Sequence, residues 1–522
     1  MDKSMFQIVH QETLGENVGL FIVIMFSIFL VAILHTRFSR KSRCLPPGPW
    51  PWPIVGNLLM LGEHPHVTLT RWAEKYGPLM HLQLGSINTV VASSPTMAKE
   101  FLRTQDHVFQ YRPSSLAFKI LTKNSSMGVI SGPALQHIRK ICTNELFTFK
   151  RIQSFQPMRT KEIRETIKDI YKEANEGKAV DLTLKLTSIS TNHMTQMLFK
   201  KRYCGIGSDN KEAQWFKEIT NAITYWEGAF IISDYIPYLR WVTKLQGIDT
   251  SLQALRNELS NFITQIMNEH RTIPSTPNSN IEDVPKDFLD VLFTAPQEDG
   301  SGHLTDDAIQ AFITDIFVAG IGTSATTLEW VMVELLQHPN IMKCAQTELD
   351  DIVGTDRLVE ECDLQNLPYL QALLKENFRI HPSAPLLLPH CSIEPSQVRG
   401  YNLPPNTQVL VNIWAIGRDP NTWEKPLQFD PSRFMQHQDI NVQGQHFELL
   451  PFGTGRRACP GRPLAVIFIQ IVLARLLQSF DWSIPNVEEK PIDMSGTFGL
   501  TLTKTKPLCV MAHPRLQAHF YN

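Results

Sequence analysis

One stretch of eleven residues decides how the 522-residue chain is interpreted: PFGTGRRACPG, residues 451–461. Its glycines permit a tight turn in which the backbone lies close to a large flat ligand. The turn ends at Cys459, just before a predicted helix whose first turn contains Pro463. A cysteine at a helix N-terminus beside Arg456 and Arg457 is stabilised as a thiolate, and neighbouring backbone amides tune a metal that it binds. A phosphate-binding loop would have Gly-Lys-Ser or Gly-Lys-Thr instead of Gly-Arg-Arg. We therefore predict a metal–thiolate site at Cys459.

The pattern around this stretch is mostly helical. Apolar residues at three- and four-residue spacing predict helices, most clearly over Ser251–Arg271, Asp306–Leu336 and Pro463–Phe480. The polar, proline-containing run Thr272–Asp287 predicts an exposed loop. After residue 385 short runs typical of strands alternate with coil, at Thr407–Ile413, Gly499–Leu502 and Leu508–Ala512. The predicted fold class is mainly α with a minor β component, as one folded unit.

Charge and cysteine content narrow the function classes. The formal net charge is −2, from 49 basic and 51 acidic residues, so no global field attracts nucleic acid. The eight cysteines form no CxxC pair and no regular spacing. They are too sparse for a disulfide scaffold and carry no zinc signature, which indicates reduced thiols in a reducing compartment.

The N-terminus is different in kind. Val18–Leu34 is a run of 17 residues without a charge, just long enough to cross a membrane as a helix. Acidic residues precede it and a basic cluster, residues 37–43, follows it, so the rest of the chain is expected to face the cytosol. A cleaved signal peptide is disfavoured because the leader is acidic and no small-residue cleavage site follows. We predict a single transmembrane anchor over 1–36, a basic and proline-rich hinge over 37–57, and a catalytic domain over 58–522.

The pattern Phe452-x-x-Gly455-x-Arg457-x-Cys459-x-Gly461 resembles the haem-binding signature of the cytochrome P450 superfamily, in its microsomal plant-type form. The resemblance extends over nearly the whole chain, from the hinge sequence PPGP at residues 46–49 to the C-terminus. It implies the cytochrome P450 fold and haem b as cofactor, with Cys459 as the metal ligand that favours O–O cleavage. The other cofactor-binding residues that it implies lie in the same loop: Arg457 at a haem propionate, with Phe452, Gly453, Gly455 and Gly461 around it.

Three charged residues elsewhere fit the same resemblance. Glu376 and Arg379 match the family's Glu-x-x-Arg on a helix, where a spacing of three puts both charges on one face. Arg433, in the sequence FDPSRF, is implied as the third member of this structural ion-pair network. Such a pair alone is usually a solvated helix face, and it gains meaning from its position before Cys459. His390, in LPH, falls where the family often places a propionate partner, with a plain surface histidine as the alternative.

The opposite side of the haem is expected on the helix through AGIGTS, residues 319–324. Here the family has an acid followed by a threonine, and the resemblance implies that the threonine helps to deliver protons to dioxygen. Thr323 is present as the implied catalytic residue, but Gly322 stands in place of the acid. Water in the space beside glycine, a hydrogen bond from the substrate, or a less ordinary reaction are the alternatives. Asp315 is about 12 Å away along a helix, too far to replace the acid directly.

A second departure lies at Leu135-Gln136, where members of the family usually have Trp-Arg and the tryptophan donates to a propionate. Arg139 is the remaining cation that the resemblance places at a propionate. Loss of one charge-assisted contact costs on the order of 1–2 kcal/mol of haem affinity, which a thiolate-held cofactor tolerates.

The resemblance implies a monooxygenase that hydroxylates a small lipophilic metabolite, be it a phenolic, terpenoid, alkaloid or fatty acid, using dioxygen. Electrons would come from NADPH through a separate membrane-bound reductase, since the chain has no GxGxxG or flavin-binding unit. Candidates for its docking patch are Arg139, Lys140, Lys150 and Arg151. The expected location is the endoplasmic reticulum membrane, with membrane lipid as a partner and no nucleic acid.

Two other functions remain open at this point. One is a haem-thiolate isomerase or dehydratase that needs neither dioxygen nor reductase, although such relatives usually lose the threonine that this chain keeps as Thr323. The other is a haem-binding relative with impaired catalysis, which Gly322 and Leu135 suggest.

Overall fold

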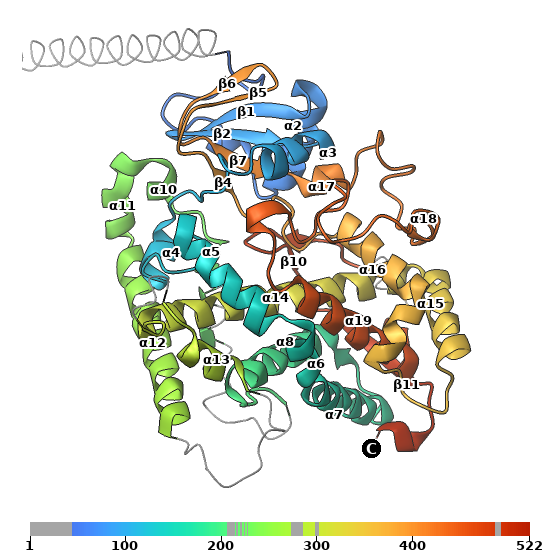
Figure 1. Ribbon diagram of the computed structural model, residues 1–522. Helices are drawn as coiled ribbons and strands as arrows, with labels where there is room; N and C mark the ends of the chain where they lie inside the picture. The colour runs from blue at the N-terminus through green and yellow to red at the C-terminus, as the bar shows by residue number, and fades with distance from the viewer. Residues whose placement is uncertain are drawn as a thin grey trace, which may run out of the picture.

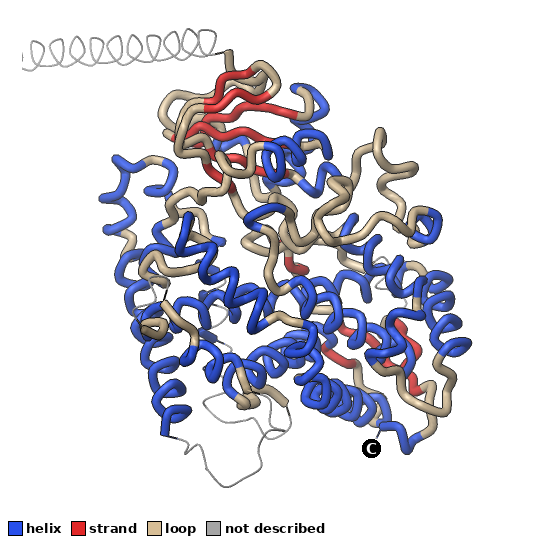
Figure 2. The backbone as a smooth tube through the Cα atoms, viewed as in Figure 1, coloured by secondary structure: helices blue, strands red, loops and turns tan. Residues whose placement is uncertain are grey.

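The computed structural model describes residues 44–521 apart from 206–214, 216–217, 220–221, 224, 227, 273–285, 298–301 and 486–491. Helices form most of the molecule, and one sheet lies at the end where the described chain begins (Figure 1). Figure 2 shows the strands gathered in that sheet and in smaller groups between helices. The predicted anchor over 1–36 lies outside the described residues, as does most of the predicted loop Thr272–Asp287.

Helix α14 (Asp306–Gln337) crosses the middle of the molecule (Figure 1). Its first turn contains Asp306 and Asp307, and the Thr305 side chain accepts a hydrogen bond from the Ala308 amide, so the N-terminus is capped and its dipole is complemented. The helix is apolar on every side because it packs against α8 (Leu182–Phe199), α16 (Pro368–Ile380) and α19 (Arg462–Ser479).

Two hydrophobic cores meet along α14. One contains its N-terminal half up to Ile321, together with α12 (Ile248–Thr272) and α13 (Phe288–Thr294). The other begins at Ala325 and joins α14 to α15 (Pro339–Ile352), α16 and α19. The part of α14 that lies between the two cores is therefore not required for core packing and can contribute to a functional site.

The main sheet has the strand order β1-β2-β7-β4. Strands β1 (Leu79–Leu84) and β2 (Ile87–Ala92) form an antiparallel hairpin in which Leu84 pairs with Ile87. Strand β7 (Gln408–Val411) runs parallel to β2, with Val409 opposite Val90, and β4 (His390–Cys391) closes the sheet. Isolated bridges from Cys391 to Gln110 and Tyr111 bring residue 390 next to the segment around residue 110.

The remaining helical elements are short or peripheral: η1 (Leu58–Met60), α2 (Pro65–Tyr76), α3 (Pro95–Lys99), η2 (Glu100–Thr104), α4 (Leu116–Leu121), α5 (Gly132–Ile141), η3 (Cys142–Leu146), α6 (Phe149–Ser154), α7 (Gln156–Asn175), α10 (Ile232–Tyr235), η4 (Pro237–Leu239), α11 (Arg240–Leu245), η5 (Glu361–Asn366), α17 (Ile413–Ile416), α18 (Ser432–Gln436), η6 (Gly455–Arg457) and η8 (Ala518–Tyr521). The remaining strands make small sheets: β3 (Val180–Asp181), β11 (Cys509–Pro514) and β8 (Phe480–Ser483); β5 (Ser396–Val398) and β6 (Tyr401–Leu403); β9 (Gly496–Thr497) and β10 (Thr503–Lys504).

The predicted fold class, mainly α with a minor β component, is confirmed, and the three long predicted helices lie within three residues of their observed bounds. One predicted strand is wrong. Residues 499–502 form the turn between β9 and β10, because Gly499 interrupts the short apolar run. Strands β1 and β2 were missed, because their apolar residues pass for one more helix in a helical region.

Two described helices, α14 and α19, are long and apolar enough to cross a membrane by composition alone. Most of each is buried within the fold, so both are core helices.

Candidate functional site

The Cys459 loop is shaped by its glycines. Gly453 and Gly455 have φ values of 61° and 71°, a left-handed conformation that favours glycine. A Cβ on Gly455 would lie 2.3 Å from the Leu102 carbonyl oxygen, so that position also requires close backbone approach. The Cys459 amide donates to the Phe452 carbonyl at 2.9 Å, which closes the loop before α19 begins at Arg462.

The Cys459 sulfur lies deep in the molecule yet remains accessible. Burial raises the pKa of the thiol, while hydrogen bonds from the backbone amides of Gly461 and Arg462, and the charge of Arg139, lower it. The side chain is nevertheless exposed, so it faces an interior space and not packed core. A buried thiol of raised pKa becomes a thiolate when it coordinates a metal ion, which deprotonates it outright.

The two arginines before Cys459 do not flank the sulfur as expected. Arg456 pairs with Asp106 at 3.3 Å. Arg457 is bound by four acceptors, at 2.6–3.0 Å: the carbonyl oxygens of Gln110, Met127 and Ile130 and the hydroxyl of Ser131. The cations near the sulfur are instead Arg139 and Arg462. Arg139 donates to the Ala458 carbonyl at 2.7 Å, so it lies on the cysteine side of the site.

A second accessible patch lies on α14 where the two cores meet. Ala319 is exposed, and Gly320, Gly322 and Thr323 are partly accessible, although most of the helix on either side is buried. The Thr323 hydroxyl donates to the Ala319 carbonyl at 2.6 Å, one turn back. Thr327 and Ser383 add two hydroxyls nearby, 2.9 Å apart, and Ser383 donates to the Thr323 carbonyl at 3.5 Å.

The two glycines of this patch serve different purposes. A Cβ on Gly320 would lie 2.4 Å from Met194 Sδ, so Gly320 allows α8 to pack closely. A Cβ on Gly322 would meet no atom of the described residues within 4 Å, so this glycine borders open space. The absent acid therefore leaves room for a small polar group beside Thr323.

Asp315 does not replace that acid. Its carboxylate accepts hydrogen bonds from the Ser126 hydroxyl and, at 2.6 Å, from the Met127 amide. Burial raises its pKa to about 7, against the opposing effect of those two donors. The residue therefore ties α14 to the segment that follows α4, away from Thr323.

Arg112, His390 and Arg457 form a group of buried or part-buried nitrogen donors near the start of β4. Arg112 donates to the carbonyls of Leu388 and Pro389 at 2.6 and 2.7 Å, and its Nε has no partner among the described residues. Burial lowers the pKa of Arg112 to about 9 and that of Arg457 to about 10, and in each case a neighbouring arginine lowers it further. His390 Nδ1 donates to the Phe109 carbonyl at 2.9 Å, and burial, with Arg112 and Arg457 nearby, holds the pKa of His390 well below the usual range. No carboxylate of the described residues forms an ion pair with any of the three, so the group suits an anionic ligand.

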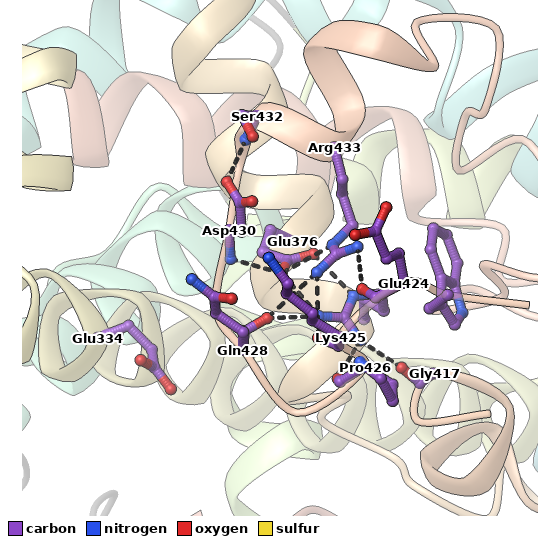
Figure 3. A network of polar contacts seen from close by, with 12 residues as sticks. Glu334, Glu376, Gly417, Glu424, Lys425, Pro426, Gln428, Asp430, Ser432 and Arg433 are labelled. Atoms are coloured by element: carbon purple, nitrogen blue, oxygen red, sulfur yellow. Dashed lines mark hydrogen bonds and ion pairs between the residues drawn. The ribbon is translucent and has the colours of Figure 1, made fainter. Parts of the chain in front are cut away.

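Glu376 is the centre of a buried network (Figure 3). Arg379 donates twice to its carboxylate, at 2.7 Å each, and both side chains are fully buried. Arg433 Nε lies 3.2 Å from the same carboxylate, and the Asp430 amide donates to it at 2.7 Å. The remaining guanidinium protons bind backbone carbonyls of Gly417, Glu424, Lys425, Pro426 and Gln428. The structure thus brings together the three charged residues singled out in the sequence.

This network is joined to the cysteine loop through α16. Phe378, between Glu376 and Arg379, packs edge-on against Phe452 with ring centroids 5.5 Å apart. Leu135, at the position of the expected tryptophan, is buried, and Gln136 is exposed.

Two functional candidates were missed from the sequence. Arg112 precedes a proline in an irregular segment, and no periodicity marks it as buried. Ser383 lies in the turn after α16, and only the fold brings it to α14. The one sequence signal that points to Arg112 is that this charged residue stands directly before a proline.

Comparison with known proteins places the chain among close relatives. A model of the family described as cytochrome P450 matches residues 46–510. Cytochrome P450 703A2 of Arabidopsis thaliana is 38% identical, over 96% of this chain and 100% of the relative. The flavonoid 3'-monooxygenase of Petunia hybrida is 37% identical, over 95% and 98%, and the flavonoid 3',5'-hydroxylase of Solanum melongena 36%, over 97% and 98%. A zebrafish cytochrome P450 solved with abiraterone superposes with a TM-score of 0.72 at 29% identity, over 87% of this chain and all of that one.

Proposed function

Since this chain belongs to the cytochrome P450 family and is therefore a haem-dependent monooxygenase, we propose that it hydroxylates a phenolic metabolite of the flavonoid type at a membrane. The observation that carries the substrate class is the identity of 36–38% with flavonoid monooxygenases and hydroxylases over nearly their whole length. A redox partner, dioxygen and a small substrate follow from the family.

The residues of the site fit a haem. Cys459 supplies an accessible sulfur in a glycine-shaped loop and is the proposed iron ligand. Arg112, His390 and Arg457 supply cationic or donor groups without a carboxylate partner among the described residues, and the Arg112 Nε proton is unpaired there. Haem propionates are anions and would complete this group. Arg139 is held by the Ala458 carbonyl, which supports a role beside the sulfur more than one at a propionate.

When bound, the haem activates dioxygen with two electrons and two protons, so that one oxygen atom enters a C–H bond of the substrate and the other leaves as water. Thr323 is the proposed proton-handling residue. Its hydroxyl would turn from the Ala319 carbonyl to hold a water molecule in the space beside Gly322, and that water would carry the protons that an acid carries in relatives.

Electrons from NADPH are proposed to arrive from a membrane-bound cytochrome reductase docked on the cysteine side. Of the four basic residues predicted there, Arg139 and Arg151 donate to backbone carbonyls. Lys140 and Lys150 are exposed and would present their charge to an acidic partner surface.

A membrane surface is proposed for the end of the molecule near the hinge. Ser86 binds the Tyr235 carbonyl at 2.8 Å and Gly85 the Val55 carbonyl at 3.1 Å, so the hinge and the α10–α11 region adjoin. Both segments, together with η1 directly after the hinge, expose large apolar side chains that are more than half accessible: Trp52, Ile54, Leu59, Tyr238, Trp241 and Leu245. Such a patch suits lipid contact. With the anchor over 1–36, the hinge over 37–57 and the catalytic domain over 58–522, we propose a single-pass protein of the endoplasmic reticulum whose catalytic domain is cytosolic.

The test is a spectral binding screen of the haem-loaded full chain against flavanones, flavones and flavonols, with monoterpenes and medium-chain fatty acids as the other arms. We expect a high-spin shift with one flavonoid class, and hydroxylated product only when NADPH, reductase and dioxygen are all present. Product from a fatty acid with no flavonoid binding would overturn the substrate class. Hydroxylated product formed in the absence of reductase or dioxygen would disprove the proposed monooxygenase reaction.

A further inference from the structure

Three helices end or begin close to one another at a point that the site described above does not use. Helix α12 ends at Thr272 with His270 in its last turn, α13 begins at Phe288 with Asp287 as its N-cap, and α8 ends at Phe199 with Lys200 as its C-cap. The three helices belong to the same hydrophobic core. A bound ion at this point would therefore connect elements that packing already holds together.

Asp287 and Asp290 face each other across the first turn of α13. Each carboxylate accepts the other residue's backbone amide at 2.9 Å, which fixes both side chains. His270 Nε2 lies 2.8 Å from Asp290 Oδ1 and 3.5 Å from Asp287 Oδ1. One ligand atom from each of the three residues lies within 4.8 Å of the other two.

The hydrogen bonds between Asp287 and Asp290 leave one carboxylate oxygen of Asp287 without a hydrogen-bond partner among the described residues. The Asp287 side chain is fully buried, and its Oδ2 has no hydrogen-bond partner in the described part of the chain. Lys200 Nζ lies 3.6 Å from this oxygen and 3.5 Å from Asp290 Oδ2, at the limit of a hydrogen bond or beyond it, and its side chain is half exposed. A buried carboxylate oxygen without a close donor is costly, so a cation that approaches it is favoured.

We propose that His270, Asp287 and Asp290 form a binding site for a divalent transition-metal ion, with zinc as the chemical match. Imidazole nitrogen and carboxylate oxygen are both ligand types that zinc accepts, and with three protein ligands, the number found in catalytic zinc sites, water would take the fourth position. Calcium and magnesium prefer oxygen ligands alone, so the histidine disfavours them. Zinc–ligand distances of about 2.0–2.2 Å fit between atoms this close together after small side-chain rotations. Lys200 is the cation that the metal displaces, and its accessible side chain can turn into solvent.

The site is tested on the haem-loaded full-length chain, without a histidine tag and stripped of metal with EDTA, by calorimetric titration with zinc chloride. We expect one site whose affinity falls at least about tenfold in His270→Ala and in Asp290→Asn. His437→Ala, which removes an exposed histidine elsewhere, should leave the affinity unchanged. X-ray absorption at the zinc edge should show nitrogen and oxygen neighbours at about 2.0–2.2 Å and no sulfur at about 2.3 Å.

A variant that keeps all three ligands guards against loss of folding. Lys200→Met removes the competing ammonium, so zinc should bind several-fold more tightly and raise the thermal unfolding midpoint. Unchanged or weaker binding in Lys200→Met, equal affinity in His270→Ala and Asp290→Asn, or sulfur in the absorption spectrum would each overturn the site.

Discussion

The two sides of the proposed haem space are built in opposite ways. On the cysteine side, the loop closes by a backbone hydrogen bond, Gly455 is fixed by close backbone approach, and α16 links the loop to the Glu376 network. On the α14 side, Ala319, Gly322 and Thr323 line the seam between two cores, and Gly322 borders open space. The first region is fixed in one geometry, whereas the second leaves room for small molecules to bind and dissociate.

The difference suggests where change is tolerated. A residue whose position is fixed by many contacts cannot be substituted without loss of cofactor binding or of the fold. A position beside open space, such as Gly322, can gain or lose a side chain with little effect on packing, and its proposed effect is on proton delivery alone. The predictions below begin with the cysteine side, where we expect the largest effects.

Cys459→Ser should abolish activity. A serine hydroxyl does not give the thiolate ligand that the proposed role requires, so the thiolate-specific band in the reduced carbon-monoxide difference spectrum should disappear and turnover should fall to background. Cys142→Ala is the control, because Cys142 is a second cysteine near Arg139 but is buried. It should keep the band. Survival of the band in Cys459→Ser would disprove the assignment.

Glu376→Ala should destabilise the fold severely. It leaves Arg379 buried without its carboxylate, which costs about 3–5 kcal/mol of unfolding free energy. Urea unfolding followed by circular dichroism measures the loss. Glu176→Ala removes a pair of the same 2.7 Å length on the surface and should leave the midpoint unchanged. If Glu376→Ala and Glu176→Ala lower the free energy of unfolding equally, burial of the Glu376 network is not the source of its stabilising effect.

Alanine substitutions at Gly320 and Gly322 should distinguish a closely packed position of α14 from one that borders open space. Alanine gains the same helix propensity at both positions. At Gly320 its Cβ would crowd Met194, whereas at Gly322 it would meet nothing described. We expect Gly322→Ala to be more stable than Gly320→Ala by about 1–3 kcal/mol in urea unfolding. Equal stabilities would mean that Met194 moves aside freely.

The sequence predicts the two regions unequally. Cys459, Glu376, Arg379 and Arg433 lie in motifs that resemble those of the family, and the structure brings the three charged residues together. Arg112 and Ser383 reach the site only through long-range contacts, to residue 388 and residue 327, which no local pattern contains. The β1–β2 hairpin was missed for a related reason, since its strands are buried on both faces and lack the alternation of a half-exposed strand.

Gly322→Asp should improve the coupling of NADPH consumption to product. The side chain fits the open space and supplies a proton donor beside Thr323, so we expect coupling to rise about two- to tenfold. Gly322→Asn is the matched control, because it has the same size and no acidic proton. If the two variants behave alike, or if Gly322→Asp loses product, the glycine belongs to the mechanism and the family's acid is not what this enzyme lacks.

The smallest effect concerns Asp315, whose carboxyl links α14 to the segment after α4. Its pKa is about 7, above the ordinary value near 4, because of burial. Between these values the folded protein holds a proton that the unfolded chain has released, so this residue's contribution to stability falls as pH rises through that window.

Asp315→Asn cannot ionise, and it keeps one acceptor for the two donors, Ser126 and Met127. The difference between its unfolding temperature and that of the wild type should therefore shift in the variant's favour by about 2 °C or more from pH 5.5 to pH 8. Asp307→Asn, which changes an exposed carboxylate on the same helix, should show a gap that does not depend on pH in this way. A gap that stays constant in Asp315→Asn would mean that the carboxyl is ionised throughout.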